Sequence, residues 1–233
     1  MVWISLALLA LTLLIVVLNS SAGVWDRKNG LVLFSKTIAI GLFCGFLLPM
    51  WSLSFATEAL GREREGQNLV WVLTRPLSRP AIYLAKLLAA LPWCLGLNLG
   101  GFALICAGAG ETGVKALRLY WPAVLAGTLA YTSLFHLMGA WFRRSAVVAV
   151  LYSLFFESFM GSMPGYWKRT SISFYTRCLM FDAGEEYGVR PNNPVTYIPV
   201  SGPTALWVLA VVGSLFLLWG MVVFSRSEYL DLN

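Results

Sequence analysis

Long apolar runs separated by polar segments set the hydropathy pattern of this chain. A helix that crosses a bilayer needs about 20 apolar residues, because the hydrocarbon core is about 30 Å thick and each helical residue rises about 1.5 Å. Six runs approach or reach this length, and we expect spanning helices at about 2–22, 37–58, 84–107, 119–142, 145–161 and 203–224. The pattern therefore predicts an all-α integral membrane protein whose two termini lie on the same side of the membrane.

The first apolar run has an alternative interpretation as a secretory signal peptide. From Met1 to Trp25 it carries no charged side chain, so it lacks the basic segment that precedes the apolar core of a signal peptide. The run is also long for such a core. We therefore expect it to be kept as the first span of a single transmembrane domain, 1–233.

Composition agrees with a membrane environment. Hydrophobic residues make up 58% of the 233 residues and charged residues 12%, whereas a soluble domain carries about 25% charged residues. The ten Trp fit a chain with two membrane interfaces. The net charge is +6, but the basic residues fall between apolar runs rather than along one face. Anionic lipid headgroups therefore explain the basic charge better than nucleic acid does.

Two connections between the runs are long, at 59–83 and 161–202. The first is dense in charge, and the second mixes charge with Pro and Gly. Basic residues divide almost evenly between the two sides of the predicted bundle, so the positive-inside rule leaves the orientation open. Within the second connection, residues 171–180 are apolar enough to lie at a membrane interface and are partly at helical spacing.

The four cysteines predict neither a disulfide nor a metal site. Cys44, Cys94 and Cys106 lie in apolar runs, and no Cys pair or Cys/His cluster has metal-binding spacing. Cys178 stands alone in the polar connection 161–202. We expect an impermeant thiol reagent to reach Cys178 from outside.

Residues 61–79 read GREREGQNLVWVLTRPLSR, and Lys86 follows at the start of the third run. This stretch resembles the signature of the permeases of type-2 ATP-binding-cassette exporters, the ABC-2 family. In those permeases the second span leads into a charged Glu-Arg-Glu turn, a short helix, a Pro-x-Ser-Arg segment and a Lys. The departure is Gly66-Gln67-Asn68, where the family more often has a Gly followed by Thr or Ser. Asn68 can still cap a helix through its side-chain oxygen.

A second stretch, 152–165 followed by 171–175, resembles the end of the fifth span in permeases grouped with the copper-enzyme maturation exporters. In that group a Glu, a Gly and a Pro close the span before an outward segment. Here Glu157 and Pro164 occupy two of these places. Together with the six-run layout, the two resemblances cover nearly the whole chain.

The resemblance implies a permease subunit of an ATP-driven exporter in the bacterial inner membrane. It implies six spans with cytoplasmic termini that form half of the substrate pathway, next to a second permease copy or a homologous permease. ATP is bound by separate ATPase subunits, so the permease itself needs no cofactor. The connection 59–83 then holds a cytoplasmic coupling helix, and 161–202 forms re-entrant or surface helices on the outer side.

The residue spacing fits a short coupling helix after Asn68. Leu69, Val72 and Leu73 fall at i, i+3 and i+4, so one apolar face can rest on the membrane or on the span bases. The opposite face is free for a partner, and a Pro ends the helix. The alternative is an interfacial helix that only anchors the connection. We expect the ATPase to couple through Arg62, Glu63, Arg64, Glu65, Asn68, Leu69, Val70, Trp71, Thr74, Arg75 and Pro76.

Two ionisable residues lie inside predicted spans. Glu157 is near the end of the fifth run, and an ionisable group within a span usually faces a cavity or a partner. We expect Glu157 to be a candidate for the transport path, and the alternative is that it reaches headgroup water. For His136, in the fourth run, we favour a hydrogen-bonded packing role over a proton relay.

Motifs for catalysis are missing from the sequence. Without a Gly-Lys dipeptide a Walker-A loop is impossible, so ATP hydrolysis belongs on another subunit. His136 is the only histidine, and no G-x-S-x-G precedes it, which argues against a rhomboid-like protease. The leading hypothesis is the exporter permease. The alternatives are a non-transporting scaffold or assembly subunit of this fold and an integral membrane enzyme, and the transported substrate stays open.

Overall fold

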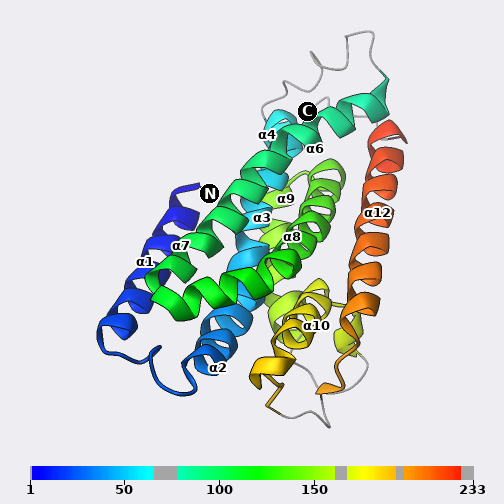
Figure 1. Cartoon of the computed structure of the whole chain (residues 1–233). Coiled ribbons are helices and arrows are strands. Elements are labelled where there is room, and N and C mark those ends of the chain that lie inside the picture. The colour runs from blue at the N-terminus through cyan, green and yellow to red at the C-terminus, as the bar shows by residue number, and fades with distance from the viewer. Residues whose placement is uncertain (1, 66–77, 161–166, 193–196, 227–233) are drawn as a thin grey trace.

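The computed structural model describes residues 2–65, 78–160, 167–192 and 197–226, and in these ranges the chain is helical and contains no strand (Figure 1). The all-α fold class is therefore confirmed. The first half contains α1 (Val2–Ser21), α2 (Gly30–Phe34), η1 (Ser35–Leu47), α3 (Leu48–Ala56), α4 (Glu58–Glu65), α6 (Arg79–Leu95), η2 (Gly96–Gly100) and α7 (Gly101–Gly108). The second half contains α8 (Gly110–Trp141), α9 (Ser145–Leu151), η3 (Tyr152–Met160), η4 (Trp167–Thr170), α10 (Ile172–Gly184), η5 (Glu185–Tyr187) and α12 (Gly202–Arg226).

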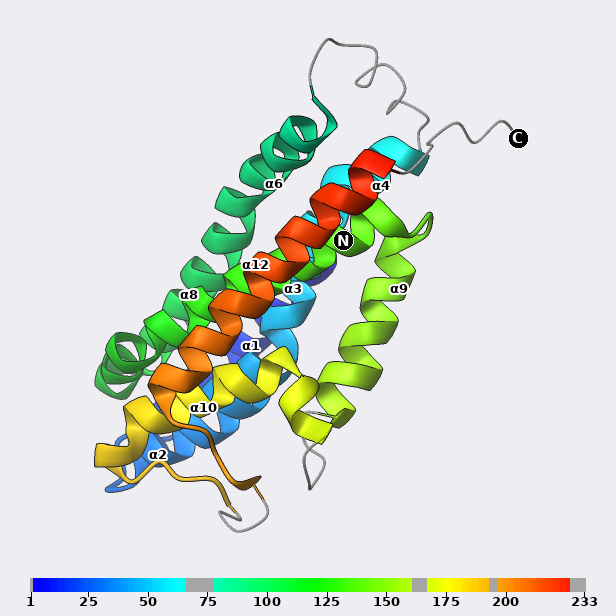
Figure 2. The same ribbon diagram turned by 90° about the vertical axis from the view of Figure 1, so that its right-hand side faces the viewer.

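Several of these elements join end to end into long helices. Five resulting helices are long and apolar enough to cross a membrane: Trp3–Ser21, Gly30–Gly61, Arg79–Gly108, Gly110–Trp141 and Gly202–Arg226. The fifth predicted run corresponds to a shorter apolar helix, Ser145–Glu157. Figure 2 shows this α9 segment running along the bundle beside the longer helices. The count of six spans therefore stays a prediction.

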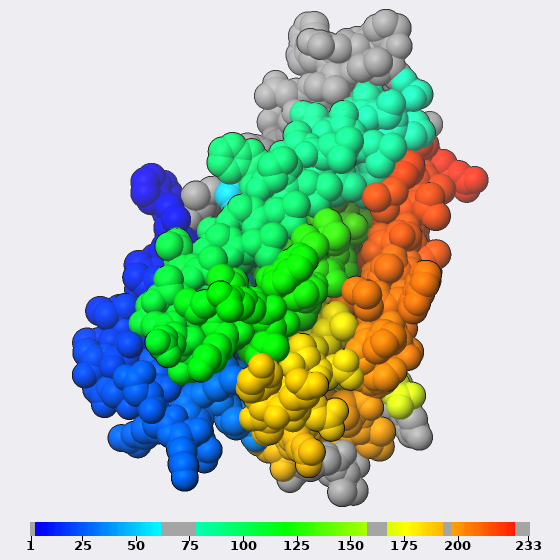
Figure 3. Space-filling model, in the orientation of Figure 1, coloured from blue at the N-terminus to red at the C-terminus, as the bar shows by residue number. Residues whose placement is uncertain are grey.

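Helix α8 is the centre of the bundle. In its most apolar window 83% of the residues are buried, against 17% in the corresponding windows of α1 and α12. Those two outer helices point most of their apolar side chains away from the protein, as helices do where they face lipid or another subunit. In the space-filling view α1 and α2 lie at the left, α6, α7 and α8 cross the middle, α12 lies at the right, and α10 lies at the lower end (Figure 3).

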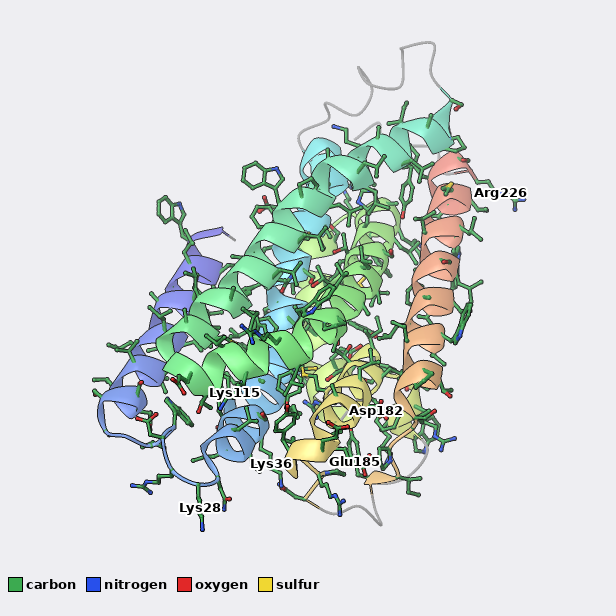
Figure 4. The ribbon with its side chains drawn as sticks, viewed as in Figure 1. Lys28, Lys36, Lys115, Asp182, Glu185 and Arg226 are labelled. Atoms are coloured by element: carbon green, nitrogen blue, oxygen red, sulfur yellow. The ribbon has the colours of Figure 1, made fainter. Side chains whose placement is uncertain are left out.

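The charged side chains gather at the two ends of the bundle. Lys28, Lys36, Asp182 and Glu185 lie at the end that carries α2 and α10, and Arg226 lies at the opposite end (Figure 4). We call these the α10 end and the α4 end, because α4 and the start of α6 lie beside the end of α12. Both ends are polar, as expected where a bundle meets two layers of headgroups.

Three stretches of π-helix interrupt the α-helices, at η1, η2 and η3. A π-turn bonds residue i to i+5 and rotates the following side chains relative to an α-helix, and such turns are frequent at functional sites. η1 and η3 contact each other, and both contact α10. Two of the three π-helical stretches, η1 and η3, therefore lie beside α10, and η3 carries the buried carboxylate described below.

A helix does form over the apolar part of the second long connection, since α10 covers most of 171–180. It does not leave Cys178 accessible, however. Cys178 is 1% exposed and packs with Phe174 and Ala205 in a small buried cluster. The expectation that an impermeant reagent labels this thiol is therefore wrong, because the polar sequence around Cys178 folds as an amphipathic helix with the thiol on its inner face.

Candidate functional site

Helix α4 continues the second long helix after a single turn residue, Thr57. The helical bonding resumes at once, since the amide of Gly61 donates a 2.8 Å hydrogen bond to the carbonyl of Thr57. Glu58 lies in the first turn of α4, where a carboxylate interacts favourably with the helix dipole. The backbone of Arg62, Glu63, Arg64 and Glu65 belongs to this helix, where the resemblance implied a charged turn. The other predicted coupling residues lie outside the described residues: Asn68, Leu69, Val70, Trp71, Thr74, Arg75 and Pro76.

Close glycine contacts hold α4 against two neighbouring helices. A Cβ atom at Gly61 would collide with the hydroxyl of Ser145, the first residue of α9. A Cβ atom at Gly139 of α8 would lie 3.2 Å from the Thr57 carbonyl oxygen and 3.6 Å from Cβ of Leu60. Because both glycines lack a side chain, the α4 root packs closely on α8 and α9 at these two points.

The start of α6 is tied to the end of α12. Nη1 of Arg79 donates a 3.1 Å hydrogen bond to the carbonyl of Ser225, as basic side chains do at helix C-termini. One turn later, Tyr83 packs over Gly220, where any side chain would collide with its ring and hydroxyl. A small buried cluster then joins α4, α6, α8 and α12 and consists of Leu60, Ile82, Tyr83, Ala140 and Phe224.

The connection 59–83 therefore has two anchored ends, which we call its roots. The α4 root comprises residues 56–61 and the α6 root comprises residues 79–83. His136 of α8 lies between them, with Nδ1 at 3.3 Å from the carbonyl oxygen of Ala56 and Nε2 at 3.2 Å from that of Tyr83. The ring is fully buried, and its centroid is 4.5 Å from that of the Tyr83 ring. The burial and the two contacts agree with the packing role that the sequence favours over a proton relay, and that role stays a prediction.

The second candidate residue, Glu157, is a fully buried carboxylate at the α10 end. Its Oε2 accepts hydrogen bonds from the hydroxyls of Tyr131 and Ser171, at 2.8 and 2.6 Å, and from the amide of Ser173 at 2.9 Å. Its Oε1 accepts from the hydroxyl of Tyr152 at 2.9 Å and from the amide of Ile172 at 3.2 Å. Five donors thus replace the water that an exposed carboxylate would bind.

These contacts place the carboxylate at the N-terminus of α10. Ser171 is the N-cap residue, and its Oγ also accepts from the amide of Phe174 at 3.4 Å. The amides of Ile172 and Ser173 are among those that a helix leaves without internal partners. Since backbone amides only donate, the carboxyl oxygens of Glu157 serve as their acceptors at the N-terminus of α10.

Glu157 therefore does not reach headgroup water, the alternative raised by its position in the sequence. In this conformation the carboxylate faces the interior of the chain and joins η3 to α10. The predicted role of Glu157 in the transport path concerns substrate movement, and it stays a prediction.

Sequence reasoning did not find the partners of Glu157. Tyr152 lies five residues before it, a spacing that separates two side chains in an α-helix but brings them together in the π-turns of η3. Tyr131 and Ser171 come from other elements and carry no local signal. Ser171 before an apolar run is a recognised N-cap pattern, however, and it could have located the start of α10.

Two cations that the sequence did not mark, Arg177 and Lys168, lie in and just before α10. The guanidinium of Arg177 points from α10 toward η1, where it lies against the backbone of Gly45. Lys168 is 2% exposed, and burial lowers the pKa of its ammonium group. Its Nζ lies 5.6 Å from the ring centroid of Phe174 and 5.0 Å from that of Tyr197, so two aromatic faces help to hold the charge.

Comparison with known protein families identifies the family of this chain. The sequence profile of the family described as ABC-2 family transporter protein matches residues 1–163, which include both roots of the connection 59–83 and Glu157. The chain belongs to the ABC-2 transporter family. No curated protein and no solved structure matches it. The match identifies the family and not the copper-enzyme maturation group, so that finer resemblance stays an expectation.

Membership of the ABC-2 family makes this chain a multi-pass membrane permease of an ATP-binding-cassette transporter. Permeases of this family are membrane components that generally carry no enzymatic activity, bind no cofactor and work with separate ATPase subunits. Among the described residues of this ABC-2 permease, no group of three or more His, Cys, Asp or Glu side chains could hold a metal ion.

Proposed function

We propose that this ABC-2 permease is the membrane subunit of an exporter and that the connection 59–83 couples it to two separate ATPase subunits. The α4 end is cytoplasmic in this proposal, with both termini on that side, and the α10 end faces outward. The six spans comprise the five long helices and the shorter α9–η3 helix. A second copy or a homologous permease supplies the other half of the substrate pathway in the bacterial inner membrane.

The observation that carries the proposal is the way both roots are built into the bundle. The α4 root packs on α8 and α9 through Gly139 and Gly61, and the α6 root is bonded to α12 through Arg79. A force on the residues between the roots would therefore act on four long helices at once. An interfacial helix that only anchored the connection would need no such contacts.

The second long helix offers a route from one end of the bundle to the other. Gly30–Gly61 runs from α2 at the α10 end to α4, with Thr57 as its turn. Its η1 part contacts both η3 and α10. Closure of ATP-bound ATPases against the coupling residues would thus shift α4 and, through η1, the elements around Glu157. This sequence of movements is the alternating-access mechanism that we propose.

Glu157 enters the proposal through α10. Because its carboxylate is buried against α10 in this conformation, it can reach a transport path only when α10 moves away from η3. The hydrogen bonds support a role in holding α10 over the outer end of the bundle. In the state described here, substrate exit at that end would be blocked by α10.

The test is copurification from native membranes through an affinity tag on this permease. We expect an ATP-binding-cassette ATPase to copurify and to lose most of its ATP hydrolysis when the permease is removed. Absence of any ATPase would contradict the proposal. If an ATPase copurifies but the complex moves none of the candidate substrates in sealed vesicles, the scaffold alternative is favoured instead.

A further inference from the structure

Three aromatic rings meet at the α4 end of the bundle, where the end of α8 packs against α12. The ring centroids of Trp141 and Trp219 are 5.4 Å apart, and those of Trp141 and Phe142 are 5.6 Å apart in a stacked pair. Trp141 and Trp219 are each about half exposed. Tryptophan gathers at the boundary between hydrocarbon and headgroups, because its ring is apolar and its N–H is polar. The cluster therefore marks the height of a membrane interface on the surface of the bundle.

Trp219 also lines an apolar hollow on the surface of α12. The hollow measures about 520 Å³, a size typical of ligand sites, and is lined by Val212, Leu215, Phe216, Leu218, Trp219 and Val222. From the first to the last of these residues the helix rises about 15 Å, at about 1.5 Å per residue. The hydrocarbon core of a bilayer is about 30 Å thick, so the hollow is about as long as the hydrocarbon of one leaflet. Its length and its apolar lining fit an acyl chain that lies along α12.

Arginine side chains lie beyond the hollow and the rings, toward the α4 end. Arg226 is exposed and lies about two helical turns after Trp219 on the same side of α12, at the α4 end (Figure 4). Arg143 and Arg144 follow Phe142 directly, form the turn between α8 and α9, and are also exposed. Among the described residues, none of these three guanidinium groups has an ion-pair partner. This corner of the molecule is therefore positively charged.

An anionic phospholipid matches both the apolar hollow and the charge beside it. Guanidinium groups bind phosphate oxygens through paired N–H donors, and aromatic rings pack where the acyl chains join the headgroup. A zwitterionic headgroup also carries a cation, which three arginines would repel, so a net negative headgroup fits better. A second copy of this chain, related by a two-fold axis across the membrane, would bring the same three arginines to the same height. Like charges would then face each other at this corner, which disfavours a second copy as the occupant.

We propose that the hollow on α12 and the arginines beside it bind one anionic phospholipid, in the leaflet at the α4 end. The acyl chain lies along Leu215 and Trp219, and the phosphate lies between Arg226 and the turn that joins α8 to α9. The bound lipid braces this turn, and the residue that follows the turn, Ser145, lies against Gly61 of the α4 root. The site needs neither an ATPase nor a particular orientation of the chain. Its failure would therefore leave the proposed function untouched.

The test is native mass spectrometry of the full-length permease in detergent. The protein is equilibrated with equal amounts of phosphatidylglycerol and phosphatidylcholine that carry identical acyl chains, and the lipids that stay bound are identified by mass. We expect the wild type to retain one phosphatidylglycerol in preference to phosphatidylcholine. The two lipids differ only in the headgroup, so this preference measures the contribution of charge.

Removal of the arginines should weaken the binding of phosphatidylglycerol. One basic residue near a headgroup layer changes the affinity for anionic lipid about fivefold. Arg226→Gln should therefore lower phosphatidylglycerol binding about fivefold, and the double variant Arg143→Gln/Arg144→Gln about 25-fold. The matched control is Arg27→Gln/Lys28→Gln, which removes the same charge from an exposed basic pair at the α10 end (Figure 4). This control should bind phosphatidylglycerol as the wild type does.

Three results would overturn the site. Equal retention of the two lipids by the wild type would mean that the arginines do not select the headgroup. A preference that survives in both arginine variants, or that is lost equally in the control, would place the anionic lipid elsewhere on the protein. A wild type that appears as a lipid-free dimer would mean that a second copy covers this face of α12 instead.

Discussion

The carboxylate of Glu157 and the hydroxyl of Ser171 share a 2.6 Å hydrogen bond, the shortest of the five that converge on this carboxylate. Ser171 is at the same time the N-cap of α10. One buried carboxylate in η3 thus binds the capping residue and the next two amides of α10. The five printed donors to the carboxylate are hydroxyls and backbone amides, and two of them belong to the first turn of a helix, where the dipole favours negative charge.

Glu157→Gln should destabilise the α10 end. An amide places an N–H₂ group among five donors, so at least one backbone amide of α10 is left buried without an acceptor. We expect the free energy of unfolding to fall by about 3 kcal/mol, the upper range for a hydrogen bond to a charged group. The measurement is thermal or denaturant unfolding of the purified permease in detergent.

A matched control for this variant is Glu185→Gln on η5. Its carboxylate lies 4.0 Å from Arg190, and both side chains are about two-thirds exposed. Removing such an exposed ion pair should change stability by less than about 1 kcal/mol. Equal effects of the two substitutions would show that the hydrogen bonds of Glu157 do not stabilise the protein.

Gly61→Leu should separate α4 from α9. A leucine side chain at this position meets the Ser145 hydroxyl directly, so the α4 root must tilt or shift. We expect the protein to insert and fold, since the collision lies at the end of the bundle, but to lose several-fold in permease-dependent ATP hydrolysis. Gly96→Ala is the control because a Cβ atom there meets no atom within 4 Å. Full activity of Gly61→Leu would mean that α4 does not transmit movement.

Reversing charge on α4 should weaken the ATPase contact. Glu63→Lys or Glu65→Lys would place a like charge against a basic groove on the partner or break a local pair, and we expect less ATPase to copurify. An exposed ion pair accounts for about 1 kcal/mol or less, so a larger loss would indicate a partly desolvated contact. Glu186→Lys, at the far end of the bundle, should have no effect. Unchanged complexes with both α4 variants would favour the scaffold hypothesis.

The orientation of the chain can be tested with engineered thiols. All four native cysteines are buried, and burial raises the pKa of the Cys178 thiol, so an impermeant maleimide should leave the wild type unlabelled on both counts. Glu186→Cys should be labelled in intact cells, and Gln67→Cys only after the membrane is opened. The reverse result would place the α4 end outside.

The apolar runs by themselves determined the fold class and nearly all of the helices. A run of about 20 apolar residues without a charge can be recognised from the local sequence alone. In lipid such a run forms a helix, because a helix satisfies all of its backbone hydrogen bonds internally. The same local reasoning marked Glu157 and His136 as unusual, since each is a polar group inside an apolar run. It also marked the connection 59–83 through its charges and its Pro.

Only the tertiary structure decided what these residues contact. Glu157 finds Tyr131 and Ser171 on other elements, and His136 finds carbonyls that are 80 and 53 residues away in the chain. The contact between Gly61 and Ser145 likewise depends on how closely α4 and α9 approach. Hydropathy records how much each residue avoids water, whereas these contacts depend on helix rotation, including the π-turns, and on which helices are neighbours. Neither quantity is encoded in a local pattern, so both had to come from packing.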